Sequence, residues 1–203
     1  MYAHLHQAGR AGPGPDPSSQ AGTDAARQPG LRGSITFRQL AGPADVCLTL
    51  WDTTTSAAAF AGRHNGQAPL PAEIYQVTAA REGPAAAQVP TCARLIYFDG
   101  PQAPEQAAAA DRAGRDRIWP AIRGLSGLTG IYVLQASDLG AVIITLATSL
   151  ETLDAAARAA MSTELMPGED PALLPGPSRI EIHHVTGYHV PAASPAASCK
   201  DPT

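Results

Sequence analysis

Two adjacent histidines, His183 and His184, are the residues of this sequence best suited to acid–base chemistry. Imidazole has an ordinary pKa near 6.5, so it can exchange a proton at neutral pH. The stretch IEIHHV around them is typical of a strand, and alternation along a strand sends the two rings to opposite faces. Only one ring can serve a given site. His183 is the predicted catalytic base; the alternative is a hydrogen-bonded histidine of the core.

Four further side chains are predicted to bind a substrate. Trp119 could form one wall of a pocket, or could be an ordinary core aromatic residue. Tyr97 and Tyr132 could donate a hydrogen bond to an oxyanion or orient a bound substrate, or could only cap the edge of a sheet. Arg94 lies three residues from Tyr97 on one predicted strand, so the two point to opposite faces. Arg94 could pair with an anionic substrate, or could reach solvent or an acidic neighbour.

No metal or cofactor is predicted. His4 and His6 share one face of a predicted strand, a spacing that can hold a metal together with a third ligand, but no carboxylate or cysteine completes such a set. Cys47, Cys92 and Cys199 have no metal-ligand spacing, and an odd number of cysteines cannot pair completely within one chain. A reducing, cytoplasmic location fits this cysteine content.

Composition indicates a globular protein. Of the 203 residues, 44% are hydrophobic and 16% charged, which supplies a core and argues against a disordered chain. The formal net charge of −4 gives no electrostatic signature for nucleic acid or for an anionic membrane surface. The sequence contains no signal-peptide pattern and no apolar run long enough to span a membrane. We therefore expect neither a nucleic acid nor a membrane as partner.

The elements that must position these side chains recur in two halves of the chain. A phrase near the start of each half is shared, and two later segments match in the same order, with an insertion over 162–177 in the second half. The matched segments are GLRGSITF (30–37) with GLTGIYVL (127–134), 44–64 with 140–160, and AEIYQVT (72–78) with IEIHHVT (180–186). Chance explains any one match more easily than several in order.

The second half predicts the order strand, helix, strand, strand, helix, strand. The expected strands are 93–98, 131–137, 141–148 and 179–190, and the expected helices are 104–119 and 150–165. Thr148 and Glu151 have the spacing of a capping box for the second helix, and Pro120 should kink or restart the first. This order is the ferredoxin-like pattern. The first half keeps the strands, but its first helix has room for only about two turns near residues 20–28.

The predicted fold class is α+β, with two tandem ferredoxin-like repeats packing sheet to sheet as a pseudo-dimeric α/β barrel. One apolar face of each sheet needs cover, and the other repeat supplies it within the chain. The predicted divisions are a degenerate repeat over 1–80, a linker over 81–90, a better-kept repeat over 91–190 and a disordered tail over 191–203. The chain would thus form an intramolecular pseudo-dimer, and further association of two chains is left open.

The sequence resembles the dimeric α/β barrel superfamily, in particular its antibiotic biosynthesis monooxygenase-like branch. The motifs that carry the resemblance are WPAIRGLSGLTGIYVL (119–134), AVIITLATSLETLDAAARAA (141–160) and the closing strand IEIHHV, while 1–80 resembles the branch weakly. In the first half Trp51 matches a tryptophan common in the family at the end of the third strand. These motifs concern the fold more than the chemistry.

The resemblance implies a pocket between the sheet and its helices. Members of the branch include cofactor-independent oxygenases, in which a bound phenol or enol loses its proton and its anion reduces dioxygen. Haem degradation is disfavoured, because Gln7, Phe60 and Leu70 stand near the positions where that chemistry needs an asparagine, a tryptophan and a histidine. Two hypotheses follow: a cofactor-independent monooxygenase acting on an aromatic small molecule, with its pocket in the C-terminal half, or a non-catalytic small-molecule binding or scaffold protein of the same fold.

Overall fold

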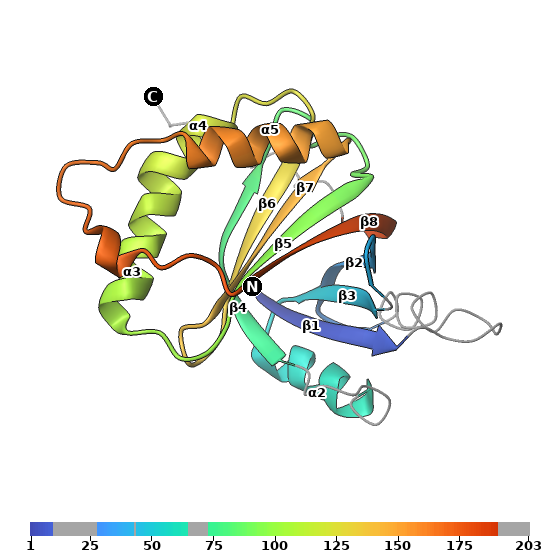
Figure 1. Ribbon diagram of the computed structural model, residues 1–203. Helices are drawn as coiled ribbons and strands as arrows, with labels where there is room; N and C mark the ends of the chain where they lie inside the picture. Colours follow the sequence, from blue (N-terminus) through green and yellow to red (C-terminus); the bar gives the residue numbers. More distant parts are fainter. Residues whose placement is uncertain (10–27, 43, 65–72, 191–203) are drawn as a thin grey trace, which may run out of the picture.

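The computed structural model describes residues 1–9, 28–42, 44–64 and 73–190, and its eight strands form one closed antiparallel barrel (Figure 1). The first half of the chain supplies β1 (Tyr2–Gly9), β2 (Leu31–Gln39), β3 (Ala44–Trp51) and β4 (Glu73–Glu82). The second half supplies β5 (Cys92–Phe98), β6 (Leu128–Gln135), β7 (Ala141–Ala147) and β8 (Arg179–His189).

Strand order confirms the predicted fold class. Around the barrel the strands follow the order β4-β1-β3-β2 and then β8-β5-β7-β6, so each half has the arrangement of a ferredoxin-like sheet. Two further antiparallel pairings, β2 with β8 and β4 with β6, join the halves. The sheets therefore cover each other's apolar faces, as predicted, and their edges are also hydrogen-bonded to one another. Closure leaves no free strand edge in the barrel.

The barrel interior is a single apolar core to which both halves contribute. Alternate residues of each strand point inward and pack there, as the period of a β-strand requires. Its buried members are Ala3, Leu5, Ile35, Phe37, Val46, Leu48, Leu50, Tyr75, Ala93, Leu95, Tyr97, Leu134, Val142, Ile144 and Leu146.

The helices cover the outside of the barrel (Figure 1). In the first half α2 (Thr54–His64) packs on the sheet. In the second half α3 (Pro104–Ala113), α4 (Trp119–Ile122) and α5 (Leu150–Met161) cover the outer face. The short helix predicted near residues 20–28 falls almost entirely within 10–27, outside the described residues, and so does the predicted tail over 191–203.

A π-helical turn over Gly114–Ile118 joins α3 to α4. The Trp119 N–H donates to the Gly114 carbonyl, five residues back, rather than to the usual residue four back. Proline at position 120 has no N–H to donate and its ring crowds the preceding turn, so the wider turn just before it accommodates the residue. The predicted restart at Pro120 therefore takes the form of a continuous helix with a π turn.

The cap of α5 lies one residue later than predicted. The Ser149 side chain accepts a hydrogen bond from the Thr152 N–H, so Ser149 rather than Thr148 is the N-cap. Thr148 is engaged elsewhere, because its N–H donates to the Gly127 carbonyl at 3.0 Å. A Cβ at Gly127 would lie 2.3 Å from the Thr152 hydroxyl oxygen, so only glycine fits where the chain passes the start of α5.

The division into repeats has no sharp linker in the structure. β4 continues to Glu82, two residues into the predicted linker over 81–90, and the Gly83 N–H donates to the Thr129 carbonyl at 3.0 Å. The domain boundaries remain a prediction. Within the described part of the chain, no helix is long and apolar enough to cross a membrane.

Candidate functional site

The five residues predicted for the site lie on two sides of the sheet. His183, Tyr97 and Tyr132 point into the barrel, where they pack with its core. Arg94 and Trp119 lie outside, on the side covered by helices. The structure thus brings together His183 and Tyr97, and it separates both of them from Arg94 and Trp119 by the backbone of the sheet.

Inside the barrel, the Glu181 carboxylate is the centre of a polar cluster. Its Oε2 accepts a hydrogen bond from the Tyr97 hydroxyl at 3.2 Å and lies 3.1 Å from His183 Nε2. Its Oε1 lies 3.0 Å from Arg179 Nη1. The Arg179 guanidinium also lies 3.6 Å from the centroid of the Tyr97 ring, a cation–π contact. Glu181 therefore ties β5 to β8 at one end of the barrel.

Burial dominates the acid–base properties of this cluster. His183 has no exposed surface, and burial lowers its pKa, an effect that the hydrogen bond and charge of Glu181 partly oppose. Burial and the nearby Glu181 charge raise the pKa of Tyr97. The neutral forms of both rings are thus favoured. With Nε2–H directed at the carboxylate, His183 Nδ1 is left as an acceptor and has no hydrogen-bond partner among the described residues.

Tyr132 is also part of the barrel interior but does not join this cluster. It packs half-buried against the core from β6, and burial raises its pKa to about 12. Its hydroxyl is therefore neutral at any physiological pH. The charges of Tyr188 and Glu82 contribute to this raised pKa of Tyr132, but less than burial does.

Outside the barrel, Arg94 lies in a row of side chains that crosses the sheet. The paired residues of this row are Ile182 on β8, Arg94 on β5, Thr145 on β7 and Ile131 on β6. Arg94 is half-buried, and its Nε is buried without a hydrogen-bond partner among the described residues. Burial lowers the pKa of its guanidinium, while Asp154 on α5 acts in the opposite direction.

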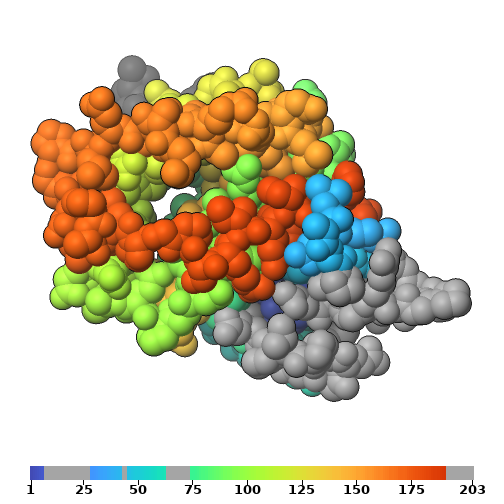
Figure 2. All heavy atoms as spheres, viewed as in Figure 1, coloured from blue at the N-terminus to red at the C-terminus, as the bar shows by residue number. Residues whose placement is uncertain are grey.

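The next row of the same face is entirely apolar. Its members are Ile180, Ile96, Ile143 and Val133, in order from β8 to β6. Although these side chains lie on the face that the helices cover, Ile180 is 54% exposed and the other three are only partly buried. Helices α3 and α5 therefore do not seal this part of the sheet. Figure 2 shows the surface hollowed between α3, the sheet, and α5 with the segment that follows it.

Trp119 lies at the β6 end of the Arg94 row. It packs in the cluster formed by Ile122, Leu128, Ile131 and Ala156, and Arg81 of β4 lies 5.5 Å from its ring centroid. Neighbouring strands are about 4.8 Å apart, so Ile131, two strands away from Arg94, is about 10 Å from it across the sheet. Trp119 thus lies at the β6 side of the outer face. This position is compatible with both predicted roles, a wall of a pocket and an ordinary core residue.

The matching face of the N-terminal half is filled. His4 and Thr49 pair in the same register as Arg94 and Thr145, so His4 occupies the position that Arg94 occupies in the second half. His4 is fully buried, with the Phe60 ring of α2 edge-on to it at 5.7 Å.

Trp51 packs on Phe60 at 5.1 Å and donates to the Thr49 hydroxyl. The counterparts of Trp51 and Phe60, 96 residues later, are Ala147 and Ala156, so α5 places no aromatic ring above Arg94.

Two side chains of interest were not among the predicted site residues. Glu181 is two residues before His183, so strand alternation already placed them on one face, and this was the signal for their contact. For His184 the sequence predicted only that its ring points to the face opposite that of His183. It pairs with Cys92 and lies exposed on the outer face of β8, the same face as Arg94.

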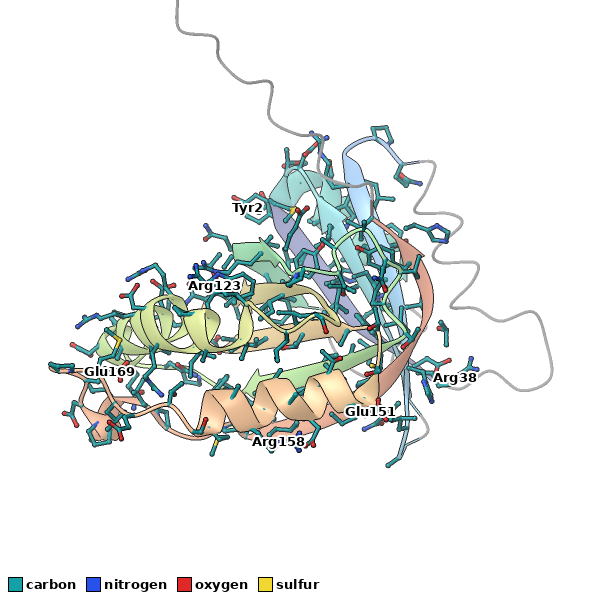
Figure 3. All side chains as sticks on the ribbon, turned by 90° about the horizontal axis from the view of Figure 1, so that it is seen from above. Tyr2, Arg38, Arg123, Glu151, Arg158 and Glu169 are labelled. Atoms are coloured by element: carbon teal, nitrogen blue, oxygen red, sulfur yellow. The ribbon has the colours of Figure 1, made fainter. Side chains whose placement is uncertain are left out.

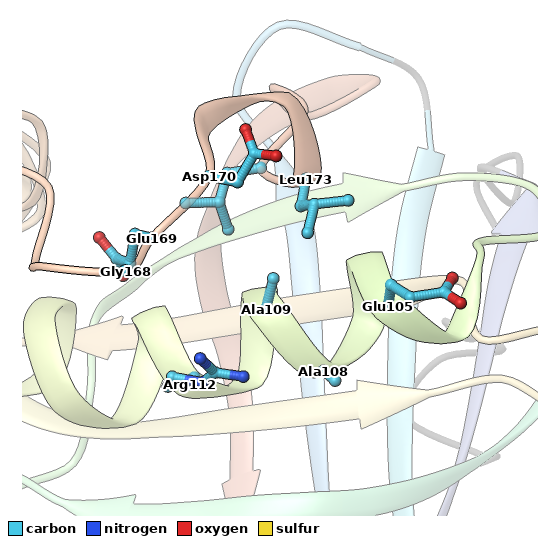
Figure 4. A pocket seen from close by; sticks show the side chains of 9 residues that line it. Glu105, Ala108, Ala109, Arg112, Gly168, Glu169, Asp170 and Leu173 are labelled. Atoms are coloured by element: carbon cyan, nitrogen blue, oxygen red, sulfur yellow. The ribbon is translucent and has the colours of Figure 1, made fainter.

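A separate small cavity lies between α3 and the segment that leads to β8 (Figure 4). Its volume is about 270 Å³, and its lining residues are Glu105, Ala108, Ala109, Arg112, Gly168, Glu169, Asp170, Leu173 and Leu174. None of the predicted site residues lines it. Beside it, Arg117 lies 2.9 Å from Glu169 and donates to the Thr163 hydroxyl at 2.7 Å, which fixes this segment against the π turn. Glu169 is labelled in Figure 3 at the end of the helical layer.

The histidines of β1 lack the companions of a metal site. The His4 and His6 rings stack with centroids 5.0 Å apart. Across the described ranges, no group of three His, Cys, Asp or Glu side chains has the geometry to hold a metal ion.

Likeness to known proteins comes from structure rather than sequence. No protein-family model and no curated protein matches the sequence. A proposed monooxygenase from Fusobacterium nucleatum superposes with a TM-score of 0.67 at 9% identity over 94% of both chains. An anthrone oxidase-like protein gives a TM-score of 0.59 at 15% identity over 97% of this chain and 96% of that one.

A third structure carries the name of the family branch that the sequence resembles. This ferredoxin-fold protein, related to antibiotic biosynthesis monooxygenases and from Listeria monocytogenes, gives 0.55 at 10% identity over 92% of this chain and 95% of that one. The chain has the same dimeric α/β barrel fold, formed within a single polypeptide. The resemblance found in the sequence is thereby confirmed for the fold, while identities this low say nothing about residue roles.

Proposed function

We propose that this protein is a cofactor-independent monooxygenase that oxidises an aromatic, phenolic small molecule in the hollow of its C-terminal half. The observation that carries the proposal is the difference between the two halves. Trp51 and Phe60 pack above His4, whereas the matching residues of the second half are Ala147 and Ala156, so α5 places no aromatic ring above Arg94. An apolar hollow with a few polar groups is the usual form of a small-molecule site.

The lining suits an aromatic ring. Isoleucine and valine side chains form the floor, and Trp119 stands at its far end. Apolar walls of this kind reduce the water around a bound reactive anion and leave room for dioxygen. The fold is also that of structures described as a proposed monooxygenase and as anthrone oxidase-like, which is support by analogy of fold.

The proposed reaction needs no external reductant. A phenol loses its proton, and the phenolate gives electrons to dioxygen. The ring carbon para to the hydroxyl then gains one oxygen atom and loses its hydrogen, which yields a quinone, while the second oxygen atom leaves as water. The protein has to bind and orient the ring, receive the phenolic proton and keep bulk water out.

Two histidines are candidates for the residue that accepts the phenolic proton. His183 is predicted from the sequence, but it is sealed inside the barrel, with the β8 backbone between it and the hollow. His184 is exposed on the face that carries Arg94. Substituting each to glutamine forms a matched pair, because the two residues are neighbours on one strand and differ in the side to which they point.

The test is incubation of the metal-free protein with a panel of anthrones and of phenols that carry hydrogen on the para carbon under air, with oxygen uptake and quinone formation measured. Ile96→Phe adds a ring to the floor of the hollow and should reduce turnover by at least about tenfold, whereas Val89→Phe, at an exposed position outside both rows of the floor, should leave it unchanged. Loss of activity in His183→Gln but not in His184→Gln would identify His183 as the proton acceptor. The reverse result would identify His184. Equal turnover with and without protein would exclude the oxygenase.

A second candidate function, non-catalytic binding of a small aromatic molecule, is favoured by one observation. Along the two rows that form the floor, the described side chains are isoleucines, a valine, a threonine and Arg94, and none is an ordinary proton acceptor. Saturable binding of the same compounds without oxygen uptake would support this alternative.

A further inference from the structure

Arg94 is the one charged side chain in the two rows that form the floor of the hollow. Its Nε is buried and has no hydrogen-bond partner among the described residues. A guanidinium N–H that is buried without an acceptor is costly to a folded protein, and structures normally supply a partner. A side chain in this state, beside a hollow, indicates that the partner arrives with a ligand.

Asp154, the acidic residue whose charge affects the pKa of Arg94, is not the missing hydrogen-bond partner. Asp154 on α5 acts on Arg94 through its charge. However, the Asp154 carboxylate forms its ion pair with Arg158, one helical turn along the exposed side of α5, and its side chain is 60% exposed. Figure 3 shows Arg158 projecting from α5 into solvent. Both members of that pair are on the exposed side of the helix, so neither supplies a hydrogen-bond acceptor to Arg94.

The geometry of the donor narrows the ligand chemistry. The Nε–H and one Nη–H of a guanidinium form a planar fork that matches both oxygens of a carboxylate. Phosphate sites commonly combine such a fork with a helix N-terminus. Here the first turn of α5 is closed by the Ser149 cap, and the neighbours of Arg94 along its row are Thr145 and Ile182. A single fork in an otherwise apolar floor fits a monoanion with two coplanar oxygens.

We infer that the ligand of this hollow is an aromatic compound that carries a carboxylate, and that Arg94 pairs with this carboxylate through Nε and Nη. The inference rests on the proposed function, because it uses the same hollow, and it adds the substrate class. The aromatic ring lies on the isoleucine row, and the carboxylate fixes which ring carbon faces the open end.

The pseudo-symmetry of the barrel supports this assignment. At the matching position of the N-terminal half the chain has His4, buried under Phe60 in a closed space. The threonine beside it, Thr49, is kept as Thr145 in the second half. The open half therefore has a guanidinium where the closed half has an imidazole. The charged side chain thus occurs in the half that has space for a ligand.

The experiment compares two ligands that differ only in charge. Binding of 2,5-dihydroxybenzoate and of its neutral analogue 2,5-dihydroxybenzyl alcohol is measured by calorimetry under argon, which prevents oxidation. We expect the carboxylate to bind at least about tenfold more tightly to the wild-type protein, since charge-assisted paired hydrogen bonds are the strong ones. Phenyl phosphate is the third ligand, and tighter binding of it than of the carboxylate would overturn the assignment.

Variants locate the effect. Arg94→Met should remove the preference while binding of the neutral alcohol stays within about twofold, and Arg94→Lys should keep part of it. Arg158→Met removes the same charge from the exposed side of α5 and should keep the full preference. Thermal unfolding checks folding: a midpoint for Arg94→Met equal to or above that of wild type is expected, because a buried charge without a partner is removed.

The outcomes separate the two proposals. If the alcohol binds in the hollow and the carboxylate gains nothing over it, the carboxylate inference is overturned while the aromatic site survives. If Arg94→Met keeps the preference, another residue carries it and the inference is equally overturned. If neither compound binds and the aromatic panel gives neither binding nor turnover, the proposed function itself fails.

Discussion

The Tyr97–Glu181–His183 cluster shows how single residues of the barrel interior are held. One carboxylate serves the phenol, the imidazole and Arg179, and all of these lie at the joint between β5 and β8. Buried polar groups are tolerated when they have partners, and in this cluster His183 Nδ1 alone lacks one among the described residues. Such networks fix one arrangement of a core. We interpret the cluster as a device that sets the position of β8, with any catalytic role of His183 still a prediction.

The state of His183 gives a prediction for the pH dependence of stability. An unfolded histidine takes up a proton near pH 6.5, whereas burial lowers the pKa of His183 in the folded protein. Between these two values the unfolded chain binds more protons, so stability falls as the pH drops below about 6.5. The slope for one such proton is at most about 1.4 kcal/mol per pH unit. His183→Gln should show a shallower fall in urea unfolding between pH 7 and 5.

His184→Gln is the control for that prediction, because it removes an exposed imidazole from the same strand. It should leave the pH dependence close to that of wild type. An unchanged slope in His183→Gln would mean that His183 is not held neutral by burial.

Sequence patterns correctly predicted that neighbouring side chains of a strand point in opposite directions. They did not predict what surrounds each side chain. Strand alternation correctly separated His183 from His184 and Arg94 from Tyr97. It did not reveal that His183 and the hollow would lie on different sides of β8. That outcome depends on which face of the sheet the helices cover, and this is settled by tertiary packing.

At the scale of elements, the cap of α5 offers a direct test of local structure. Ser149 accepts from the Thr152 N–H, and the Thr152 hydroxyl lies 3.2 Å from the Ser149 hydroxyl. Ser149→Ala should cost about 1 kcal/mol of unfolding free energy, the usual effect of losing an N-cap. Thr148→Ala, whose hydroxyl has only a long contact of 3.4 Å with the Gly127 carbonyl, should cost less. A larger loss in Thr148→Ala would restore the cap to the predicted position.

Elements were predicted in type and order, while their local irregularities were not. The order of strands and helices in the second half follows from hydrophobic periodicity and is reproduced by the structure. The π turn before Pro120 and the shift of the cap to Ser149 are not visible in such patterns. Both depend on which hydrogen bonds remain available, such as the one between Thr148 and Gly127.

At the scale of the whole molecule, the two halves are joined in one barrel, and we expect them to unfold together. Hydrogen-bonded pairings at β2–β8 and β4–β6 join them, and a single core fills the barrel. Trp51 lies in the first half and Trp119 in the second, so each reports on one half. In urea, the fluorescence transitions of Trp51→Phe and Trp119→Phe, each with one remaining tryptophan, should match the loss of circular dichroism of the same variant. A second transition in either variant would mean that the halves unfold separately.

The duplication could be predicted from repeated segments, and the closed barrel follows from it. The open half was also encoded: an offset of 96 residues aligns Trp51 with Ala147 and Phe60 with Ala156. Two aromatic residues against two alanines predict more space in the second half. What the sequence leaves open is the shape of that space, because α3, α4 and the segment after α5 decide how much of it remains.

The most direct test of the central claim is to locate a bound aromatic ligand by fluorine NMR on protein labelled with 5-fluorotryptophan. The resonances of Trp51 and Trp119 are assigned with Trp51→Phe and Trp119→Phe, and 2,5-dihydroxybenzoate is titrated under argon. A ligand in the C-terminal hollow should shift the Trp119 resonance in a saturable way and leave that of Trp51 in place. A saturable shift of Trp51 with Trp119 unmoved would contradict the account.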